Sequence, residues 1–238
     1  MILFDVGGTL FNSGPCIPID GLSELRKKAR NPDITDDRTL ALLWDEHMNE
    51  ISGLKSRSGI SLDMPLSATI KYITMKAGLV FEIPVIEQEE IFDRYNSSRK
   101  VIDGVPELLD TLHTLSIRTA VISNNAMSGE SLALATKWWI PDSRFEFHLT
   151  SSDILFCKPN KDIFLTATGY ANLDPSDCWY CGDSFTPDVK GSSEVGMCPV
   201  LLDSKSDIPL EFCSDRDVDK YMVVNSWHAL SGYLKHLN

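Results

Sequence analysis

Hydrophobic and polar positions follow two different patterns along this chain. From about residue 104 onward, short apolar runs alternate with stretches in which apolar residues recur every three or four positions. The first pattern predicts buried strands, and the second predicts helices that pack by one face. The expected strands are 118–123, 145–150, 177–182, 199–202 and 222–225, and the expected helices are 106–115, 128–138, 161–168, 187–196 and 226–236. Strands alternating with helices predict an α/β fold with a parallel sheet covered on both faces.

Residues 14–100 differ, because helical periodicity dominates and almost no strand is expected. Two helical faces stand out, at residues 40–51 and 66–77. An all-helical insert that follows the first strand (residues 1–4) would lie above the carboxyl ends of the strands, where open α/β sheets bind ligands. We therefore predict a core domain of residues 1–13 and 101–238, and an inserted helical cap domain of residues 14–100.

Composition and charge narrow the possible partners. The 238 residues suffice for one core with a smaller inserted domain. Acidic side chains outnumber basic ones 34 to 22, and a net charge of −12 opposes binding to nucleic acid and anionic membranes. No apolar stretch approaches the roughly 18 to 20 residues of a membrane span, and the first residues do not resemble a signal peptide. We expect a cytoplasmic protein with no nucleic-acid or membrane partner.

The CxxC spacing of Cys178 and Cys181 does not indicate a metal site. No second CxxC pair accompanies it. The two cysteines also fall in a strand-like segment, where residues three apart point to opposite faces. Two buried thiols are the expected outcome.

Five polar residues fall at or near the ends of expected strands: Asp5, Ser123, Lys158, Asp183 and Asp188. Each alone has an ordinary explanation, as a turn residue, a helix cap or a surface charge. Together they suit phosphoryl transfer, in which a carboxylate attacks phosphorus and forms an acyl phosphate. A lysine and a hydroxyl can neutralise phosphate oxygens, and further carboxylates can hold Mg²⁺ between the nucleophile and the phosphate.

Four segments carry a resemblance to a known family. They are ILFDVGGTL, DGVPELLDTLHTLSIRTAVISNN, SSDILFCKPNKDIF and YCGDSFTPDVKGSSEVGM, in this order. The chain resembles the haloacid dehalogenase-like (HAD) hydrolases, in the phosphatase branch that carries a helical cap after the first motif. The resemblance implies a Rossmann-like core sheet, a phosphatase activity and Mg²⁺ as the cofactor.

The same resemblance implies roles for the acidic residues. Asp5 would be the nucleophile and a Mg²⁺ ligand, and Asp183 would be a second ligand. Asp188 would bind the ion directly or through water. The backbone carbonyl of Gly7 would complete the protein's share of the metal site.

Phosphate binding is implied for another group of residues. Ser123 would contact the transferring phosphoryl group, with Asn124 beside it. Lys158 would steady both the nucleophile and the phosphate, and is counted as catalytic. Gly8 and Thr9 belong to the turn after the nucleophile, although Thr9 could equally have a structural role.

Gly7 departs from the family pattern, because phosphatases of this kind usually carry a second aspartate there. That aspartate protonates the leaving oxygen and then activates water. Without it, a water, a substrate group or a cap residue would have to act, or the substrate would need a good leaving group. Asn12 is the nearest polar residue downstream.

Two further interpretations remain open. In the first, the chain resembles the phosphonoacetaldehyde hydrolases, which also lack this acid and use a cap lysine. Lys55, in a loop-like stretch at 53–56, would be the candidate. In the second, the protein has a weakened site that binds a phosphorylated ligand or partner. A small phosphorylated metabolite is the expected substrate, and neither its identity nor the oligomeric state is readable from the sequence.

Overall fold

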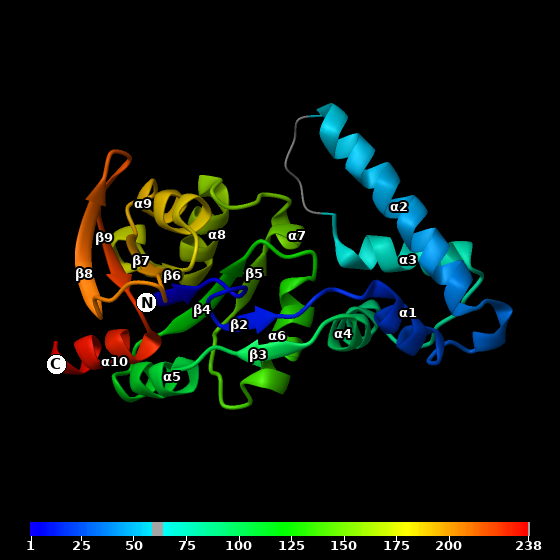
Figure 1. The fold of residues 1–238 in the computed structure, drawn as a ribbon, viewed down its shortest axis with the longest axis horizontal. Coiled ribbons are helices and arrows are strands. Elements are labelled where there is room, and N and C mark those ends of the chain that lie inside the picture. The colour runs from blue at the N-terminus through cyan, green and yellow to red at the C-terminus, as the bar shows by residue number, and fades with distance from the viewer. Residues whose placement is uncertain (59–63, 238) are drawn as a thin grey trace.

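The core of the molecule is a seven-stranded sheet, drawn in Figure 1 from a computed structural model that describes residues 1–58 and 64–237. The strand order is β5-β4-β1-β6-β7-β9-β8, and every neighbouring pair is parallel except β8 and β9. The strands are β1 (Ile2–Phe4), β4 (Thr119–Ser123), β5 (His148–Thr150), β6 (Trp179–Gly182), β7 (Cys198–Leu202), β8 (Leu210–Asp215) and β9 (Val218–Val224). This arrangement confirms the predicted α/β class with a Rossmann-like core.

Helices cover both faces of the sheet, as the hydrophobic pattern predicts. They are α5 (Val105–Thr114), α6 (Gly129–Trp139), α7 (Ser151–Ile154), α8 (Lys161–Ala171), α9 (Gly191–Ser193) and α10 (Trp227–His236). Ile2 and Phe4 of β1 pack into the apolar cluster under α5 and α10, whereas Leu3 packs into the cluster under α8. Because successive side chains point to opposite faces, β1 is buried on both sides of the sheet, where it lies between β4 and β6.

Several elements differ from the sequence-based expectation, and α7 is not among the predicted helices. The helix expected at 187–196 begins earlier, as a π-helix at Phe185–Lys190 that continues into α9. Strand β8 was not expected, because its residues lack an apolar run and several are exposed. It forms an edge strand whose only partner in the described chain is β9, so cross-strand pairing and not local pattern places it there.

A helical block lies to one side of the sheet in Figure 1. Along the chain it falls between β2 (Phe11–Ser13) and β3 (Arg99–Val101). These two short strands pair antiparallel and form the double connection to the core. The block contains α1 (Pro18–Arg26), a 3₁₀ turn (Pro32–Ile34), α2 (Asp37–Ser58), α3 (Leu66–Lys76) and α4 (Val85–Asn96). Its apolar cluster draws on α1, α2, α3 and α4 and continues into the core domain through Met127 and Ala135. The predicted cap boundaries fall at the β2–β3 ribbon.

The prediction of a loop at residues 53–56 is wrong, because these residues lie within α2. A glycine inside a helix weakens it without ending it, and the helix continues past Gly53. The side chain of Lys55 lies outside the described part of the structure.

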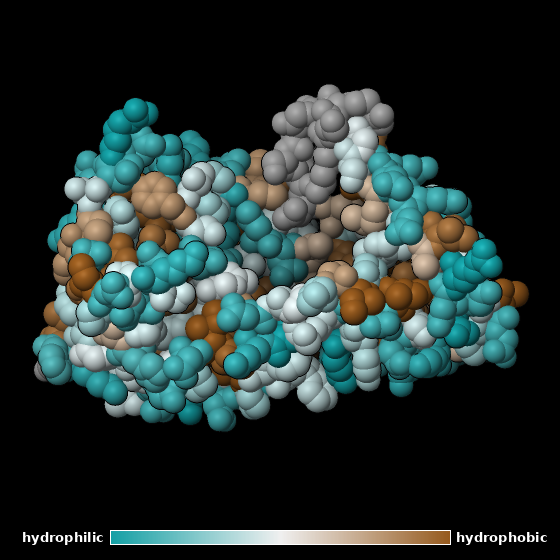
Figure 2. Space-filling model, in the orientation of Figure 1, coloured by the Kyte–Doolittle hydropathy of each residue, from teal (hydrophilic) through white to brown (hydrophobic). Residues whose placement is uncertain are grey.

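The exposed surface is mostly polar on the face shown in Figure 2. Hydrophilic residues cover most of this face, and apolar residues gather there only in small separate groups. None of the described helices is both long enough and apolar enough to cross a membrane. As expected, Cys178 and Cys181 are buried free thiols.

A buried carboxylate joins the helical block to the core. Glu89 of α4 is 1% exposed and accepts hydrogen bonds from the hydroxyls of Ser128 (2.7 Å) and Ser131 (2.5 Å), and from the backbone N–H of Ser67 (2.9 Å). Ser128 is the N-cap of α6. The partial positive charge of that helix N-terminus favours a carboxylate there. Glu89 therefore ties α3 and α4 to the start of α6.

We expect Glu89→Ala to lower the free energy of unfolding by about 1 to 3 kcal/mol, because it strands buried hydroxyl and N–H groups without partners. Urea unfolding would measure the change. Glu87→Ala, on the exposed face of the same helix, is the control and should change stability by no more than about 0.5 kcal/mol. Equal losses in the two variants would show that Glu89 does not anchor the helical block.

Candidate active site

Three carboxylates meet at one edge of the sheet. Asp5 follows β1, Asp183 follows the neighbouring parallel strand β6, and Asp188 lies in the π-helix after it. Each offers an oxygen within 4.8 Å of the others. Asp5 and Asp188 are buried, whereas Asp183 is exposed. The parallel sheet thus brings together the acidic residues that the sequence singled out.

Two glycines make room for these carboxylates. Gly8 has a φ of +72°, and a Cβ there would lie 2.1 Å from a carboxylate oxygen of Asp183. A Cβ on Gly182 would lie 2.4 Å from the carboxyl group of Asp188. Both distances are far below van der Waals contact, so side chains at these two positions would displace the acidic groups.

Lys158 supplies the positive charge at the centre of the cluster. Its side chain is 3% exposed, and its Nζ donates hydrogen bonds to Oδ1 of Asp5 (2.7 Å) and Oδ1 of Asp188 (2.6 Å). A third bond goes to the hydroxyl of Tyr180 (2.8 Å), a residue that sequence reasoning missed. The available signal was weak: a tyrosine in a buried strand usually needs a hydrogen-bond partner.

The Asn124 side chain supports Lys158, and its predicted phosphate contact stays a prediction. Its side-chain amide donates to the backbone carbonyl of Lys158 (3.0 Å), and its side-chain oxygen accepts from the Lys158 N–H (2.7 Å). This pair of bonds fixes the backbone of Lys158 against the end of β4. The structure therefore makes Asn124 a support for Lys158.

For Gly8 and Thr9, in the turn after Asp5, the phosphate contacts stay predictions. The N–H of Gly8 donates to the carbonyl of Phe11 (2.8 Å) and is not free. The Thr9 hydroxyl is buried without a hydrogen-bond partner in the described structure, so it offers no contact to a ligand in this conformation. Instead, the carbonyl of Thr9 accepts a hydrogen bond from the indole of Trp227 (2.8 Å), which fits a structural role.

Other groups remain for a phosphate and a metal. Among the described residues, the N–H groups of Val6 and Gly7 donate no hydrogen bond, and the carbonyl of Gly7 accepts none. Ser123 lies at the end of β4, buried beside β1. These groups could serve the oxygens of a phosphate, and the Gly7 carbonyl could serve a cation.

The cluster carries more negative than positive charge. Burial raises the pKa of Asp188, and nearby Asp5 raises it further while Lys158 lowers it. Partial burial raises the pKa of Asp183, and Asp5 adds to the effect. Because one ammonium faces three carboxylates, a further cation would stabilise the site. Carboxylate oxygens with a free carbonyl are a donor set that fits Mg²⁺.

Comparison with known proteins agrees with this geometry. The family model for the haloacid dehalogenase-like hydrolases matches residues 2–201. The chain belongs to this family.

Individual relatives show how far the similarity extends. A glyceraldehyde 3-phosphate phosphatase from Methanothermobacter thermautotrophicus is 24% identical over 213 residues, which are 86% of this chain and 85% of that protein. The human haloacid dehalogenase-like hydrolase domain-containing protein 3 is 30% identical over 121 residues, so the match spans about half of each chain. The crystal structure of a 2-haloacid dehalogenase from Pseudomonas syringae has a TM-score of 0.60 at 20% identity, covering 100% of this chain and 98% of that one. The last likeness shows a shared fold.

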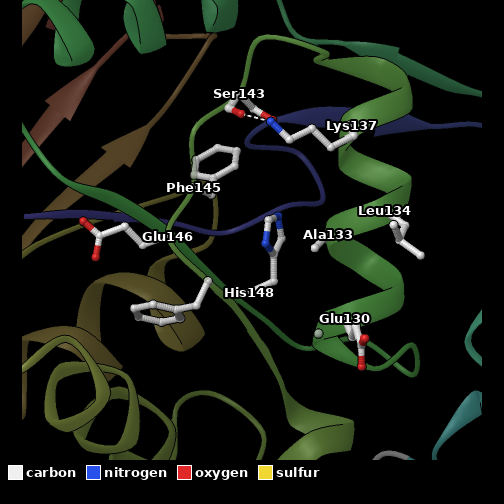
Figure 3. Close-up of a pocket in the computed structure, with 10 residues that line it drawn as sticks. Glu130, Ala133, Leu134, Lys137, Ser143, Phe145, Glu146 and His148 are labelled. Carbon is white, nitrogen blue, oxygen red and sulfur yellow. Dashed lines mark hydrogen bonds between the residues drawn. The ribbon is translucent and has the colours of Figure 1, made fainter.

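A separate hollow, lined by none of the three carboxylates, lies elsewhere in this chain. A cavity of about 450 Å³ lies between α6 and residues 143–148, and Figure 3 shows His148 and Phe145 on the side opposite the helix. Burial and nearby Lys137 lower the pKa of His148 to about 4, so its imidazole is neutral. Its buried Nε2 has no hydrogen-bond partner in the described structure and is closed to solvent. A ligand in this cavity would not reach it without a rearrangement.

The raised pKa of Asp183 predicts a pH effect on the metal-free protein. Over a window that begins at about pH 4, the folded chain keeps this proton while the unfolded chain loses it. The contribution of Asp183 to stability therefore falls as pH rises through that window. In EDTA, Asp183→Asn should lose less stability than the parent between pH 4 and pH 7, measured by urea unfolding.

Asp174 provides a control of opposite sign. Hydrogen bonds from Ser176 lower the pKa of Asp174, so its contribution to stability grows as pH rises through a window that ends at about pH 4, where the unfolded chain also loses this proton. Asp174→Asn should therefore remove a gain in stability below about pH 4 and leave the slope between pH 4 and pH 7 unchanged. A common shift in both variants would contradict the assignment of a charge penalty to Asp183.

Proposed function

We propose that this protein is a Mg²⁺-dependent phosphatase that acts in the cytoplasm on a small phosphorylated metabolite. The observation that carries the proposal is the buried Lys158, bonded to Asp5 and Asp188, with Asp183 within reach of both acids. The similarity to a glyceraldehyde 3-phosphate phosphatase over most of the chain supports the reaction class. The structural likeness to dehalogenases concerns the fold alone.

Asp5 is proposed as the nucleophile. Its carboxylate would attack phosphorus and form an aspartyl-phosphate, while the substrate's alcohol or acid leaves. Water would then hydrolyse this acyl phosphate and restore Asp5. Lys158 fixes the orientation of the Asp5 carboxylate and offsets negative charge as it develops.

Mg²⁺ would be held by Asp5, Asp183, Asp188 and the Gly7 carbonyl. The bound ion would reduce the repulsion between the nucleophile and the phosphate dianion. Ser123 and the N–H groups of Val6 and Gly7 are proposed to bind the phosphate oxygens. The same residues would bind a phosphorylated ligand in a protein that turns nothing over, which is the alternative that activity measurements decide.

No side chain stands at position 7 to protonate the leaving group. Gly7 is exposed, and a Cβ there would meet no atom within 4 Å. A substrate whose leaving group is a weak base, such as the carboxylate of an acyl phosphate, needs little proton donation. We therefore propose that the enzyme favours such leaving groups, or that water or the substrate itself supplies the proton. No observation favours the C–P bond hydrolysis considered for Lys55.

We expect phosphate release in the presence of Mg²⁺ to fall steeply as the leaving group becomes more basic. A panel from acetyl phosphate and p-nitrophenyl phosphate to sugar phosphates and nucleotides would measure this dependence. Asp5→Asn should abolish release from every compound, because no acyl phosphate can form. Activity that survives in Asp5→Asn would remove Asp5 from the mechanism, and silence of the parent with Mg²⁺ bound would support the binding protein.

We expect Gly7→Asp to raise kcat for alkyl phosphates by about tenfold or more, since acid–base catalysis typically contributes 10² to 10⁴. The open space around residue 7 should admit the side chain without disturbing the fold. Gly7→Asn has nearly the same shape without the acid and should give no gain. Equal rates for Gly7→Asp, Gly7→Asn and the parent would indicate that another group already donates the proton.

A further inference from the structure

Tyr180 is buried at the centre of the site without belonging to the predicted machinery. It lies on β6 and is 0% exposed, three residues before Asp183. Its ring packs edge-on against Phe164 of α8, with centroids 5.1 Å apart and planes at 86°. The ring therefore has a fixed direction before any ligand enters, and its hydroxyl points at Lys158.

The direction of the hydrogen bonds around this hydroxyl is unambiguous. An ammonium group can only donate, so the Tyr180 oxygen accepts the bond from Lys158 Nζ (2.8 Å). The single hydrogen of the phenol is then given to the backbone carbonyl of Ile122 (2.8 Å). Ile122 lies in β4, next to Ser123. A chain of two bonds thus runs from β4 through Tyr180 to the ammonium.

Lys158 has three N–H bonds, and the structure gives each of them one acceptor. Two go to Asp5 and Asp188, and the third goes to Tyr180. Because the three N–H bonds of an ammonium have fixed angles between them, fixing one limits the directions of the other two. The side chain is long and flexible, so without the third acceptor the ammonium could rotate and shift toward either carboxylate.

We propose that Tyr180 is a positioning residue for Lys158, whose hydroxyl holds the ammonium so that its other two N–H bonds point at Asp5 and Asp188. Its effect on turnover rests on the proposed phosphatase function. Its effect on Lys158 does not, since that contact exists in the chain without substrate.

The kinetic experiment compares the parent with Tyr180→Phe, which keeps the ring and its contact with Phe164 and removes only the hydroxyl. With acetyl phosphate and Mg²⁺, kcat should fall on the order of tenfold to a hundredfold, as expected for a misplaced catalytic group. KM should change by less than about threefold, because Tyr180 is fully buried and touches no substrate.

Ser231→Ala is the matched control. The Ser231 hydroxyl is also buried and pairs with the hydroxyl of Thr111 at 2.7 Å, in the contact between α10 and α5. Its loss should lower the melting temperature and leave both kcat and KM unchanged. A similar fall of kcat in both variants would mean that general loosening of the core, and not the aim of Lys158, causes the effect.

A double-mutant cycle tests the proposal without any turnover. Tyr180→Phe leaves a buried N–H of Lys158 unpaired, so it should lower the melting temperature. In the background of Lys158→Met that unpaired group no longer exists, and most of the loss should disappear. Ser231→Ala should cost the same in both backgrounds.

Each outcome of the cycle decides the matter. Coupling between Tyr180→Phe and Lys158→Met supports the proposal, even if no phosphate is released by the parent. Failure of Tyr180→Phe to fold, repaired by Lys158→Met, would be the same coupling in a stronger form. Additive losses, or variants that unfold in both backgrounds, would overturn it, because the hydroxyl would then act on packing alone.

Discussion

The site depends on one constraint: three carboxylates share a small volume, and one buried ammonium opposes them. Like charges at this distance repel, and burial makes the repulsion stronger than in water. Two observations reflect this cost. The pKa values of Asp183 and Asp188 are raised, and the Lys158 ammonium donates hydrogen bonds to Asp5 and Tyr180. A fold that only needed stability would gain by separating these groups. Their convergence therefore costs stability, and a bound cation, as in the proposed function, would offset that cost.

The sheet topology produces this convergence with few residues. Strand β1 lies between β4 and β6, so its end stands between those of two parallel neighbours. Asp5, Ser123 and Asp183 each lie at or directly after the end of a strand. The hydroxyl of Tyr180 in β6 donates a hydrogen bond to the carbonyl of Ile122 in β4. The flanking helices pack against the two faces of the sheet and so hold these strands in place.

The sequence predicted well what depends on local pattern. Alternating periodicities gave the sheet and most helices, and polar residues at strand ends pointed to Asp5, Asp183 and Asp188. It could not show that the Asn124 amide bonds to the backbone of Lys158, or that the Tyr180 hydroxyl accepts a bond from the Lys158 ammonium. These contacts join residues 34 and 22 positions apart. The sequence also could not show that the N–H of Gly8 closes the turn by bonding to the Phe11 carbonyl. Strand β8 was missed because its partner, and not its composition, makes it a strand.

The glycines of the first turn separate what the fold requires from what the chemistry requires. Gly8 has a positive φ and lies against Asp183, and Gly182 lies against Asp188, so packing alone excludes side chains at both positions. Gly7 has neither restriction: its φ is not in the left-handed region, and the space around its Cβ position is empty. The fold would accept an aspartate there. The lack of an acid at position 7 is thus no consequence of folding, since the space and the backbone there would admit one.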